Sequence, residues 1–347
     1  MKAKRFFIGT LAAFLLVLAC VAGYVLAVRP TVIAGRLEEG DMGLFVNERY
    51  EMAALIRNQD YSSVVMGTSL TANYRASWFE GETGEKTLKI TFPDGWISEF
   101  DRALELVFAT HPEVDRVYFC MDPNILIRSD RERTVELPDY LYNRNPLDDV
   151  EFYLSGDAVL MAAETAAARK NGTAVDLDSA YIWDDGKIFS SDEALKYYQR
   201  PGVSGSVLPD GAYLAAVEEN LAVVCRWAEE HPDVDFVVWF PPYSILYWDK
   251  MTREGTAGAI LTAVERAAYG LMEYDNVAVH CFLHNYPVIQ NLENYTDHIH
   301  CSGFITYDTA RHLLAGRWKF NEENCKMRLD ELRQFVASYD YDSLFAQ

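Results

Sequence analysis

The chain has 347 residues, half of them hydrophobic, and carries a formal net charge of −21 at pH 7. So large an apolar fraction can bury a sizeable core, which excludes a wholly disordered protein. An acidic body repels phosphate backbones, and no basic stripe with interleaved aromatic residues offsets that charge, so the sequence argues against nucleic acid as a partner.

The first thirty residues are of a different kind. Lys2, Lys4 and Arg5 precede an uncharged span of 23 residues, Phe6–Val28. About 20 apolar residues cross a bilayer as a helix, whereas the core of a signal peptide is usually about 7–15 residues long. Residues 1–30 are therefore expected to form an uncleaved transmembrane anchor. The small excess of basic residues before the span favours an orientation with the body outside the cytoplasm.

A second interpretation of this segment concerns Cys20. The residues VLAC, Val17–Cys20, loosely resemble a bacterial lipobox, in which the cysteine becomes a lipidated N-terminus. The apolar run continues to Val28, which suits a membrane span better. Under either interpretation the protein is expected to be tethered to a membrane.

The body of the chain alternates short apolar runs with stretches whose apolar residues recur at helical spacing. Residues 31–60 are expected to be a juxtamembrane connector with helical character. The phrases HPEVDRVYF and HPDVDFVVWF are two copies of one helix-to-strand connection, which start at His111 and His231. Strands are expected at 62–67, 87–92, 114–121 and 276–282, helices at 96–112, about 254–273 and 304–316, and a helix followed by a strand within 212–242.

This alternation predicts an α/β fold with a mostly parallel sheet that is covered on both faces. Residues 61–347 are expected to form one domain with an insertion at 125–210. In the insertion the alternation of strand-like and helix-like stretches stops, and one helix is predicted near 157–170. A long insertion over the carboxyl ends of parallel strands is where binding loops lie. The alternative is a purely structural cap.

Three polar residues could form a nucleophile and its base. Ser69 follows the first predicted strand in MGTSL, and DHIH, late in the chain, carries Asp297 and His300. A serine hydroxyl needs an adjacent base, usually a histidine that a carboxylate holds in one tautomer. Residues three apart in a tight turn face the same side, so Asp297 could orient His300. Both segments follow predicted strands, which in a parallel sheet places them at one edge.

These motifs resemble those of a known family. MGTSL resembles block I of the SGNH/GDSL hydrolases, with Thr68 in place of the family's aspartate, and DHIH resembles their closing Asp-x-x-His block. The resemblance implies a three-layer α/β/α fold (SGNH or flavodoxin-like), with Ser69 as nucleophile, His300 as base and Asp297 orienting it. An anchor before such a domain is similar to the D-alanyl-lipoteichoic acid biosynthesis branch of bacterial envelope proteins and to exopolysaccharide O-acetyl transfer modules.

The same resemblance implies an oxyanion hole made of the Ser69 amide, a glycine amide after the second strand and an asparagine side chain after the third. Gly95 in FPDGW is the candidate glycine, although Asp-Gly is also a common turn dipeptide. The family's Gly-x-Asn is absent after the third strand. Asp122 and Asn124 in CMDPN stand there instead, and Asn73 is a further candidate.

Together these features predict a membrane-anchored serine esterase or acyltransferase that needs no cofactor. Its substrates would be acyl esters of a cell-envelope carbohydrate or polyol, and the resemblance allows a membrane-protein partner in an acylation system. The alternative from another class is a non-catalytic envelope binding or assembly protein with a degenerate SGNH fold. Ser69 would then be an ordinary turn residue, and His300 would pair with Asp297 only structurally.

A zinc site is the other chemistry considered for this region, because zinc takes His, Asp and Cys ligands. However, the neighbours of His280 on a strand would alternate faces, and no His-Glu-x-x-His pattern occurs, so no metal is expected. The candidate ligands are His280, Cys281, His284, Asp297, His298, His300 and Cys301.

Five cysteines lie outside the apolar span, at irregular spacing and without a Cys-x-x-Cys pair. Such a set is not a disulfide framework. Most are expected to be small core residues, and Cys281 with Cys301 is a conceivable bridge.

Overall fold

The computed structural model describes residues 2–29, 36–37, 41–133, 135–145 and 147–346. The chain forms two compact units. Unit 1 comprises Met1–Asp60, Arg102–Pro112 and Glu136–Tyr181, and unit 2 comprises Tyr61–Asp101, Glu113–Val135 and Ile182–Gln347. The predicted insertion at 125–210 is thus divided, because its middle part belongs to unit 1 and both ends belong to unit 2.

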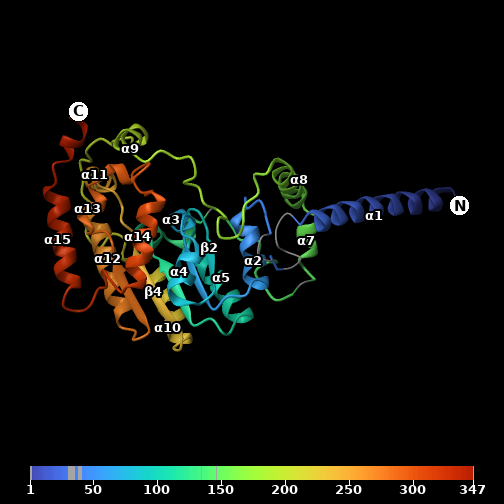
Figure 1. Cartoon of the computed structure of the whole chain (residues 1–347), viewed down its shortest axis with the longest axis horizontal. Coiled ribbons are helices and arrows are strands. Elements are labelled where there is room, and N and C mark those ends of the chain that lie inside the picture. Colours follow the sequence, from blue (N-terminus) through green and yellow to red (C-terminus); the bar gives the residue numbers. More distant parts are fainter. Residues whose placement is uncertain (1, 30–35, 38–40, 134, 146, 347) are drawn as a thin grey trace. The chain divides into compact units, whose positions relative to one another are not determined.

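Unit 2 is built on a five-stranded, all-parallel sheet flanked by helices (Figure 1). The strand order is β2-β1-β3-β4-β5, an order that also occurs in flavodoxin-type doubly wound sheets. Met66 of β1 lies opposite Ile90 on one side and Phe119 on the other. The predicted strands are confirmed as β1 Ser63–Gly67, β2 Thr87–Thr91, β3 Arg116–Cys120, β4 Asp235–Phe240 and β5 Val277–Cys281.

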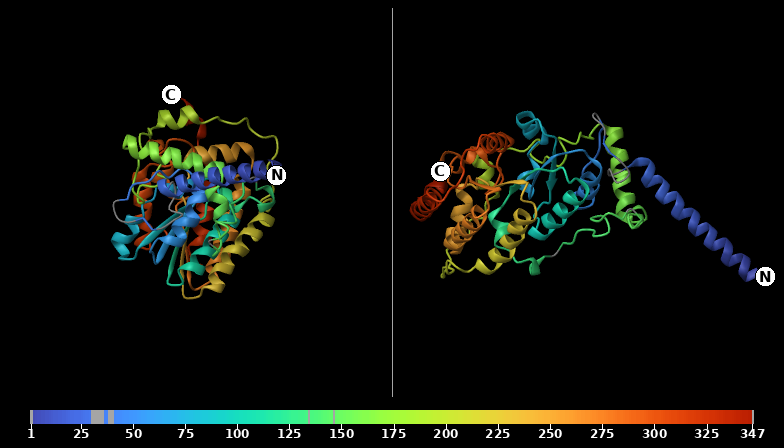
Figure 2. Two further views of the ribbon diagram at one scale, coloured as in Figure 1. Left: turned by 90° about the vertical axis from the view of Figure 1, so that its right-hand side faces the viewer. Right: turned by 90° about the horizontal axis from the view of Figure 1, so that it is seen from below.

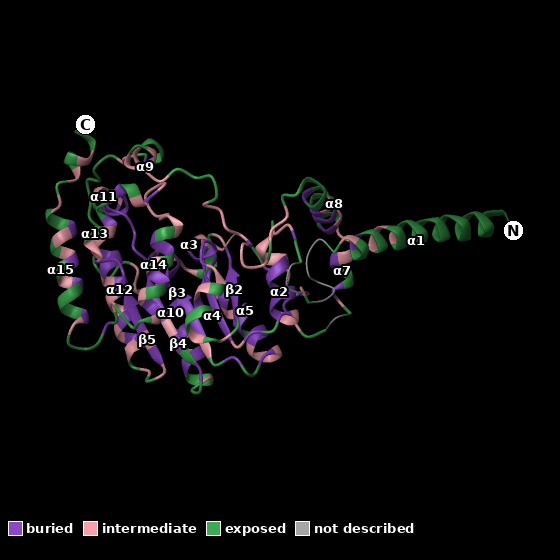
Figure 3. Ribbon diagram, in the orientation of Figure 1, coloured by how far each residue is buried: buried purple, intermediate pink, exposed green. Residues whose placement is uncertain are grey.

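The strands form the core of unit 2. Every residue of β1 and β2 is buried, as expected for parallel strands that are covered on both faces. Figure 3 shows the sheet almost entirely in the colour of buried residues. Phe119, Phe236 and Trp239 are among the largest fully buried side chains. Continuous apolar runs such as SVVMG therefore indicated these strands correctly.

Helix α10 of unit 2 buries one apolar face. In α10, Val217, Leu221, Val224 and Ala228 recur at helical spacing and are buried. Helix α12 packs against β5 and α10, and α4 packs against β2; Figure 2 shows the flanking helices from two further directions. The helices are α3 Ser69–Ala72, α4 Ala76–Thr83, α6 Pro123–Leu126, α9 Ser191–Tyr197, α10 Leu214–Glu230, α11 Ile245–Glu254, α12 Ala257–Met272, α13 Tyr286–Ile289, α14 Gly303–Leu314 and α15 Cys325–Ser338.

Helix α5, Ile97–Thr110, begins in unit 2 and ends in unit 1. It confirms the helix predicted at 96–112. The helices predicted near 254–273 and 304–316 are confirmed as α12 and α14, and the one within 212–242 as α10. Short 3-10 helices are η2 Asp130–Glu132, η3 Leu292–Asn294 and η4 Tyr341–Phe345.

Unit 1 contains the N-terminal helix and part of the insertion. Its helices are α1 Lys2–Val28, α2 Glu48–Asn58, α7 Val150–Tyr153 and α8 Gly156–Asn171. Helix α1 is long and apolar enough to cross a membrane. Helices α2 and α8 confirm the helical connector and the helix predicted near 157–170. Residues 31–35 and 38–40 of the predicted connector lie outside the described residues.

A buried carboxyl group stands out in unit 1. Glu51 of α2 is 1% exposed and accepts a hydrogen bond from the hydroxyl of Tyr181. Burial raises the pKa of Glu51 to about 8, although the hydrogen bonds from Tyr181 and from the backbone lower it in part. Glu51 is therefore mostly protonated at neutral pH, which makes the stability of this unit dependent on pH.

Candidate active site

Ser69 lies where β1 ends and a sharp turn leads into α3. A Cβ atom on Gly67 would lie 2.8 Å from the Cβ of Cys120 and would also clash with Thr71, so only glycine fits here. The hydroxyl of Thr91 donates to the carbonyl oxygen of Thr68 at 3.0 Å. Ser69 follows as the first residue of α3, partly exposed at the carboxyl edge of the sheet.

Lys89 holds the turn from the neighbouring strand β2. Its side chain is 5% exposed, and its Nζ donates to the carbonyl oxygens of Ala72 and Tyr74 at 2.7 and 2.8 Å. These carbonyls lie at the end of α3, where the helix cannot satisfy them itself. Lys89 was not among the site residues predicted from sequence. The available signal was a lysine in the middle of the otherwise buried strand TLKIT.

Ser69, His300 and Asp297 come together in one chain of hydrogen bonds. Ser69 Oγ lies 3.0 Å from His300 Nε2, and His300 Nδ1 lies 2.7 Å from Asp297 Oδ2. The carboxylate accepts, so Nδ1 carries the proton and Nε2 is left to accept from the serine hydroxyl. The relative positions of the three residues are thus those that a nucleophile, its base and an acid that orients the base require.

The second oxygen of Asp297 shapes the turn that carries the histidine. Asp297 Oδ1 accepts from the backbone amides of Ile299 and His300, both at 2.8 Å. Burial by itself raises the pKa of Asp297. The hydrogen bond and the charge of His300, together with the two amides, outweigh burial and lower the pKa to about 2. Asp297 is therefore a carboxylate at any pH near neutrality.

The segment FPPYS after β4 anchors this turn from below. Ser244 Oγ donates to the carbonyl oxygen of His298 at 2.7 Å, and Tyr295 Oη donates to the carbonyl oxygen of Pro242 at 2.7 Å. Ser244 is fully buried. These bonds connect the Asp297–His300 turn to the segment that follows β4, and they hold the turn that carries the histidine in place.

Trp183, from the insertion, contacts both the serine and the histidine. Its indole Nε1 donates to the carbonyl oxygen of Ser69 at 2.9 Å, and its ring lies edge-on to that of His300, with centroids 4.9 Å apart. Its backbone amide donates to Asn73 Oδ1 at 3.0 Å. Trp183 was not among the site residues predicted from sequence, because nothing in YIWDDG shows which distant residues it will reach.

Asp184, next to Trp183, is attached to the helix that follows the histidine turn. Its carboxylate accepts from the amide of Gly303, the first residue of α14, and a Cβ on Gly303 would clash with it. A carboxylate at the N-terminus of a helix is stabilised by the helix dipole. Burial raises the pKa of Asp184, and the Gly303 amide lowers it in part. Trp183 and Asp184 together therefore connect the insertion to the turn that carries Ser69 and to the helix that follows His300.

Asn73 has a free donor among the predicted oxyanion residues. Its side chain is 3% exposed, and its Oδ1 faces a donor, the Trp183 amide, which fixes the orientation of the side-chain amide. The Nδ2 atom has no hydrogen-bond partner among the described residues. The amide of Ser69 is at the first position of α3, where a backbone N–H has no partner within the helix.

The other oxyanion candidates are already engaged. The Gly95 amide donates to the carbonyl oxygen of Phe92 at 2.8 Å, so it could serve an oxyanion only by sharing that bond. Asn124 Nδ2 donates to the hydroxyl of Tyr243 at 3.0 Å. Asp122 is 5% exposed and accepts from Thr68, from the Asn124 amide and from Tyr243. Asp122 therefore supports the loop beneath Ser69.

Burial is the main influence on Asp122 and raises its pKa, while the hydrogen bonds from Tyr243 and the Asn124 amide lower it. Tyr243 was absent from our sequence-based site, although it belongs to the segment FPPYS. Within the described residues, no group of three or more His, Cys, Asp or Glu side chains could hold a metal ion. All six cysteines are unpaired, so the conceivable bridge between Cys281 and Cys301 is not formed.

Chemically, this arrangement can activate a serine hydroxyl for attack on a carbonyl carbon, because the base and its orienting acid are in hydrogen-bond contact before any substrate is present. No protein-family model, curated protein or solved structure matches the chain.

Proposed function

We propose that this protein is a serine esterase or acyltransferase of the SGNH type that works through an acyl-enzyme on Ser69. The observation that carries the proposal is the continuous chain of hydrogen bonds from Ser69 Oγ to His300 Nε2 and from His300 Nδ1 to Asp297 Oδ2. The resemblance of MGTSL and DHIH to the SGNH blocks supports the same assignment, as does the parallel sheet.

In the first step, Ser69 Oγ attacks the carbonyl carbon of an acyl ester while His300 Nε2 takes the hydroxyl proton. Asp297, held ionised by its low pKa, stabilises the imidazolium that forms. The tetrahedral intermediate then collapses, His300 returns the proton to the leaving alcohol oxygen, and the acyl group stays on Ser69.

In the second step, His300 deprotonates water or an acceptor hydroxyl, which attacks the acyl-enzyme and frees Ser69. A hydrolase and an acyltransferase differ only in which nucleophile arrives. The developing oxyanion would be held by the amide of Ser69 and by Asn73 Nδ2, which is buried and has no partner within the described part of the chain.

We further infer that α1 anchors the protein as a single membrane-spanning helix, with the catalytic domain outside the cytoplasm. The length and apolar character of α1 support the anchor, and the basic residues before it support the orientation. The substrates would be acyl esters of a cell-envelope carbohydrate or polyol, and the domain would have the three-layer α/β/α arrangement of SGNH hydrolases.

The proposal is tested by labelling the full-length protein, in phosphatidylcholine nanodiscs, with a fluorophosphonate probe. We expect one label in the wild type and none in Ser69→Ala. The variant Ser338→Ala is a matched control, because Ser338 is exposed on α15 and its hydroxyl only donates to a helix carbonyl. A label that persists in Ser69→Ala would refute Ser69 as the nucleophile.

The alternative is a non-catalytic envelope protein with the same fold. It is favoured by the engaged amide of Gly95 and by the hydrogen bond from Asn124 to Tyr243, which leave the oxyanion hole short of the family's usual donors. A folded wild type that takes no label and hydrolyses no p-nitrophenyl acetate would decide for this alternative.

A further inference from the structure

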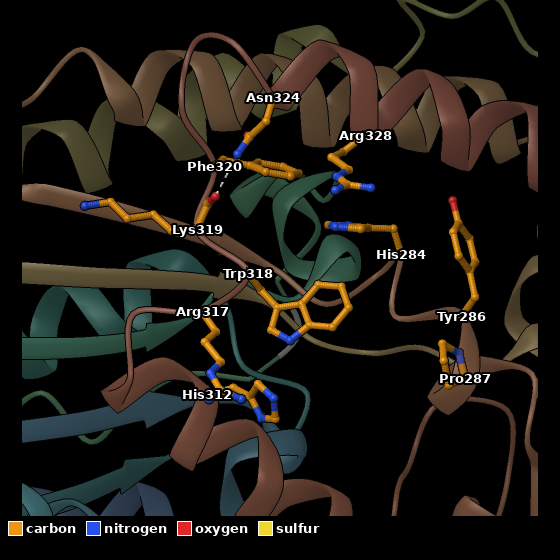
Figure 4. Close-up of a pocket in the computed structure, with 10 residues that line it drawn as sticks. All are labelled: His284, Tyr286, Pro287, His312, Arg317, Trp318, Lys319, Phe320, Asn324 and Arg328. Atoms are coloured by element: carbon orange, nitrogen blue, oxygen red, sulfur yellow. Dashed lines mark hydrogen bonds between the residues drawn. The ribbon is translucent and has the colours of Figure 1, made fainter.

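A second site lies at the opposite end of the sheet from β2, next to edge strand β5. A pocket of about 580 Å³ opens between the segment that follows β5, the loop before α15 and the first turns of α15 (Figure 4). Its walls include His284, Trp318, Phe320 and Arg328. Three inter-strand spacings separate β5 from β1, or about 14 Å, so this pocket is distinct from the Ser69 site.

The pocket is basic although the protein is strongly acidic. Arg317, Lys319 and Arg328 line it, and no acidic residue does so among the described residues. Arg328 pairs with Glu331 at 3.2 Å, but both side chains are nearly half exposed, so that ion pair is weak. No carboxylate in the described part of the chain pairs with Arg317 or Lys319. In Figure 4 the side chains of Arg317 and Lys319 extend away from His284, whereas the guanidinium of Arg328 lies beside it, so Arg328 is the cation placed to receive an anion.

A buried imidazole in the pocket wall lacks a hydrogen-bond partner. His284 is 7% exposed, and its Nδ1 is fully buried with no partner in the part of the chain that the structure describes. Its ring stacks on Phe320, with centroids 5.8 Å apart, and in Figure 4 it lies between the guanidinium of Arg328 and the indole of Trp318. Buried polar groups without partners are rare in proteins, and a ligand is one way to satisfy them.

Trp318 is held in a strained backbone conformation at the same place. Its φ angle is 62°, in the left-handed region that a bulky side chain rarely adopts. Hydrogen bonds to β5 enforce this conformation: the Cys281 amide donates to the Trp318 carbonyl oxygen at 3.0 Å, and the Phe320 amide donates to the Val279 carbonyl oxygen at 2.7 Å. Such strain is characteristic of ligand clamps, and here it presents the indole to the pocket.

We propose that this pocket binds the phosphate ester of a small sugar or polyol. The phosphate would lie against Arg328, because a guanidinium group binds phosphate in a bidentate manner. The carbon skeleton would lie against the Trp318 indole. A volume of about 580 Å³ is that of a pocket for a small organic ligand. This inference is independent of the chemistry proposed at Ser69.

The test is calorimetric titration of the full-length protein, in phosphatidylcholine nanodiscs, with glucose 6-phosphate and with glucose. We expect saturable binding of the phosphate ester and none of glucose. Losing a charged hydrogen bond costs about 1.5–3 kcal/mol, so Arg328→Gln should weaken binding by about tenfold or more. Trp318→Leu should weaken binding of glucose 6-phosphate but not that of inorganic phosphate.

Lys326→Gln is the matched control, because Lys326 is on α15 as well, is 65% exposed and pairs with Asp330 outside the pocket. It should bind within about twofold of the wild type if only pocket cations matter. Ser69→Ala should bind like the wild type, which separates this site from the proposed catalysis. Equal weakening in Lys326→Gln and Arg328→Gln would overturn the proposal, as would tight binding of glucose or no binding of glucose 6-phosphate.

A lipid headgroup offers the same phosphate chemistry as a soluble ester. Nanodiscs that contain phosphatidylglycerol distinguish the two sources. Unchanged binding of glucose 6-phosphate in such nanodiscs would support the soluble ester. Weaker binding of glucose 6-phosphate in these nanodiscs than in phosphatidylcholine alone would assign the pocket to lipid headgroups and overturn the soluble ester as its ligand.

Discussion

The indole of Trp183 donates a 2.9 Å hydrogen bond to the carbonyl oxygen of Ser69, although 114 residues separate the two in the chain. The same ring lies against His300. One side chain of the insertion thus touches both the proposed nucleophile and its proposed base, which makes the insertion part of the site and not merely a cap above it.

Trp183→Phe should reduce catalysis without abolishing it. Phenylalanine keeps an aromatic ring beside His300 but cannot donate to the Ser69 carbonyl oxygen, and one lost hydrogen bond is worth about 1 kcal/mol, or roughly fivefold to tenfold in rate. Rates of fluorophosphonate labelling measure the effect. Trp78→Phe is the control, since Trp78 packs against Tyr307 instead. Equal rates for wild type and Trp183→Phe would contradict a positioning role.

Asp297→Asn should lower kcat severely while the fold persists. The asparagine side chain can present an N–H to His300, which favours the wrong tautomer, and a comparable change in a well-studied triad costs about 10⁴ in kcat. Asp308→Asn is a close control, because Asp308 also pairs with a histidine, His312, at 3.4 Å but away from Ser69. Similar losses in both variants would indicate a general structural effect.

Asn73→Asp should slow turnover by about 10²–10³, the usual effect of removing one oxyanion donor. Aspartate still accepts from the Trp183 amide but lacks the Nδ2 donor, so the local fold should survive. We expect the loss in kcat and little change in KM. Asn124→Asp is the informative comparison: if that variant loses turnover and Asn73→Asp does not, the third donor is Asn124.

Glu51 should make stability decline as pH rises. Its pKa is raised to about 8 in the folded protein, so between about pH 4.5 and 8 the unfolded chain has lost a proton that the folded protein retains. The free energy of unfolding contributed by this group is therefore largest at low pH and falls through that range. Melting temperatures of wild type and Glu51→Gln, measured across pH 5–9 (roughly the range set by the two pKa values), test this expectation. The variant should lack the decline. Parallel curves would contradict it.

Cys20→Ser should leave membrane attachment unchanged. If α1 is an uncleaved anchor, the serine variant and the wild type both stay in the membrane after alkaline extraction, because the apolar helix and not a lipid holds them. A lipoprotein would lose its attachment on this change, and intact-mass measurement of the wild type would show an added acyl mass and a missing leader. Either result would contradict the anchor.

The sequence by itself determined the elements of the sheet and their order along the chain. Continuous apolar runs such as SVVMG and helical spacing such as that in α10 are local patterns in the sequence. They suffice to predict a strand that is buried on both faces or a helix that is buried along one stripe, because burial of apolar side chains is the dominant force in both. Ser69, Asp297 and His300 were also predicted from sequence, since a motif after a strand places a side chain at the carboxyl edge of a parallel sheet.

Only the tertiary structure decided which residues surround Ser69. Trp183, Lys89 and Tyr243 reach the site through contacts between distant segments, and no local pattern specifies such contacts. The same holds for the state of each oxyanion candidate. The Gly95 amide is engaged, and Asn73 Nδ2 has no partner in the described part of the chain, only as a result of their three-dimensional neighbours. Hydrogen bonds depend on distances of a few tenths of an ångström, which packing sets and periodicity does not.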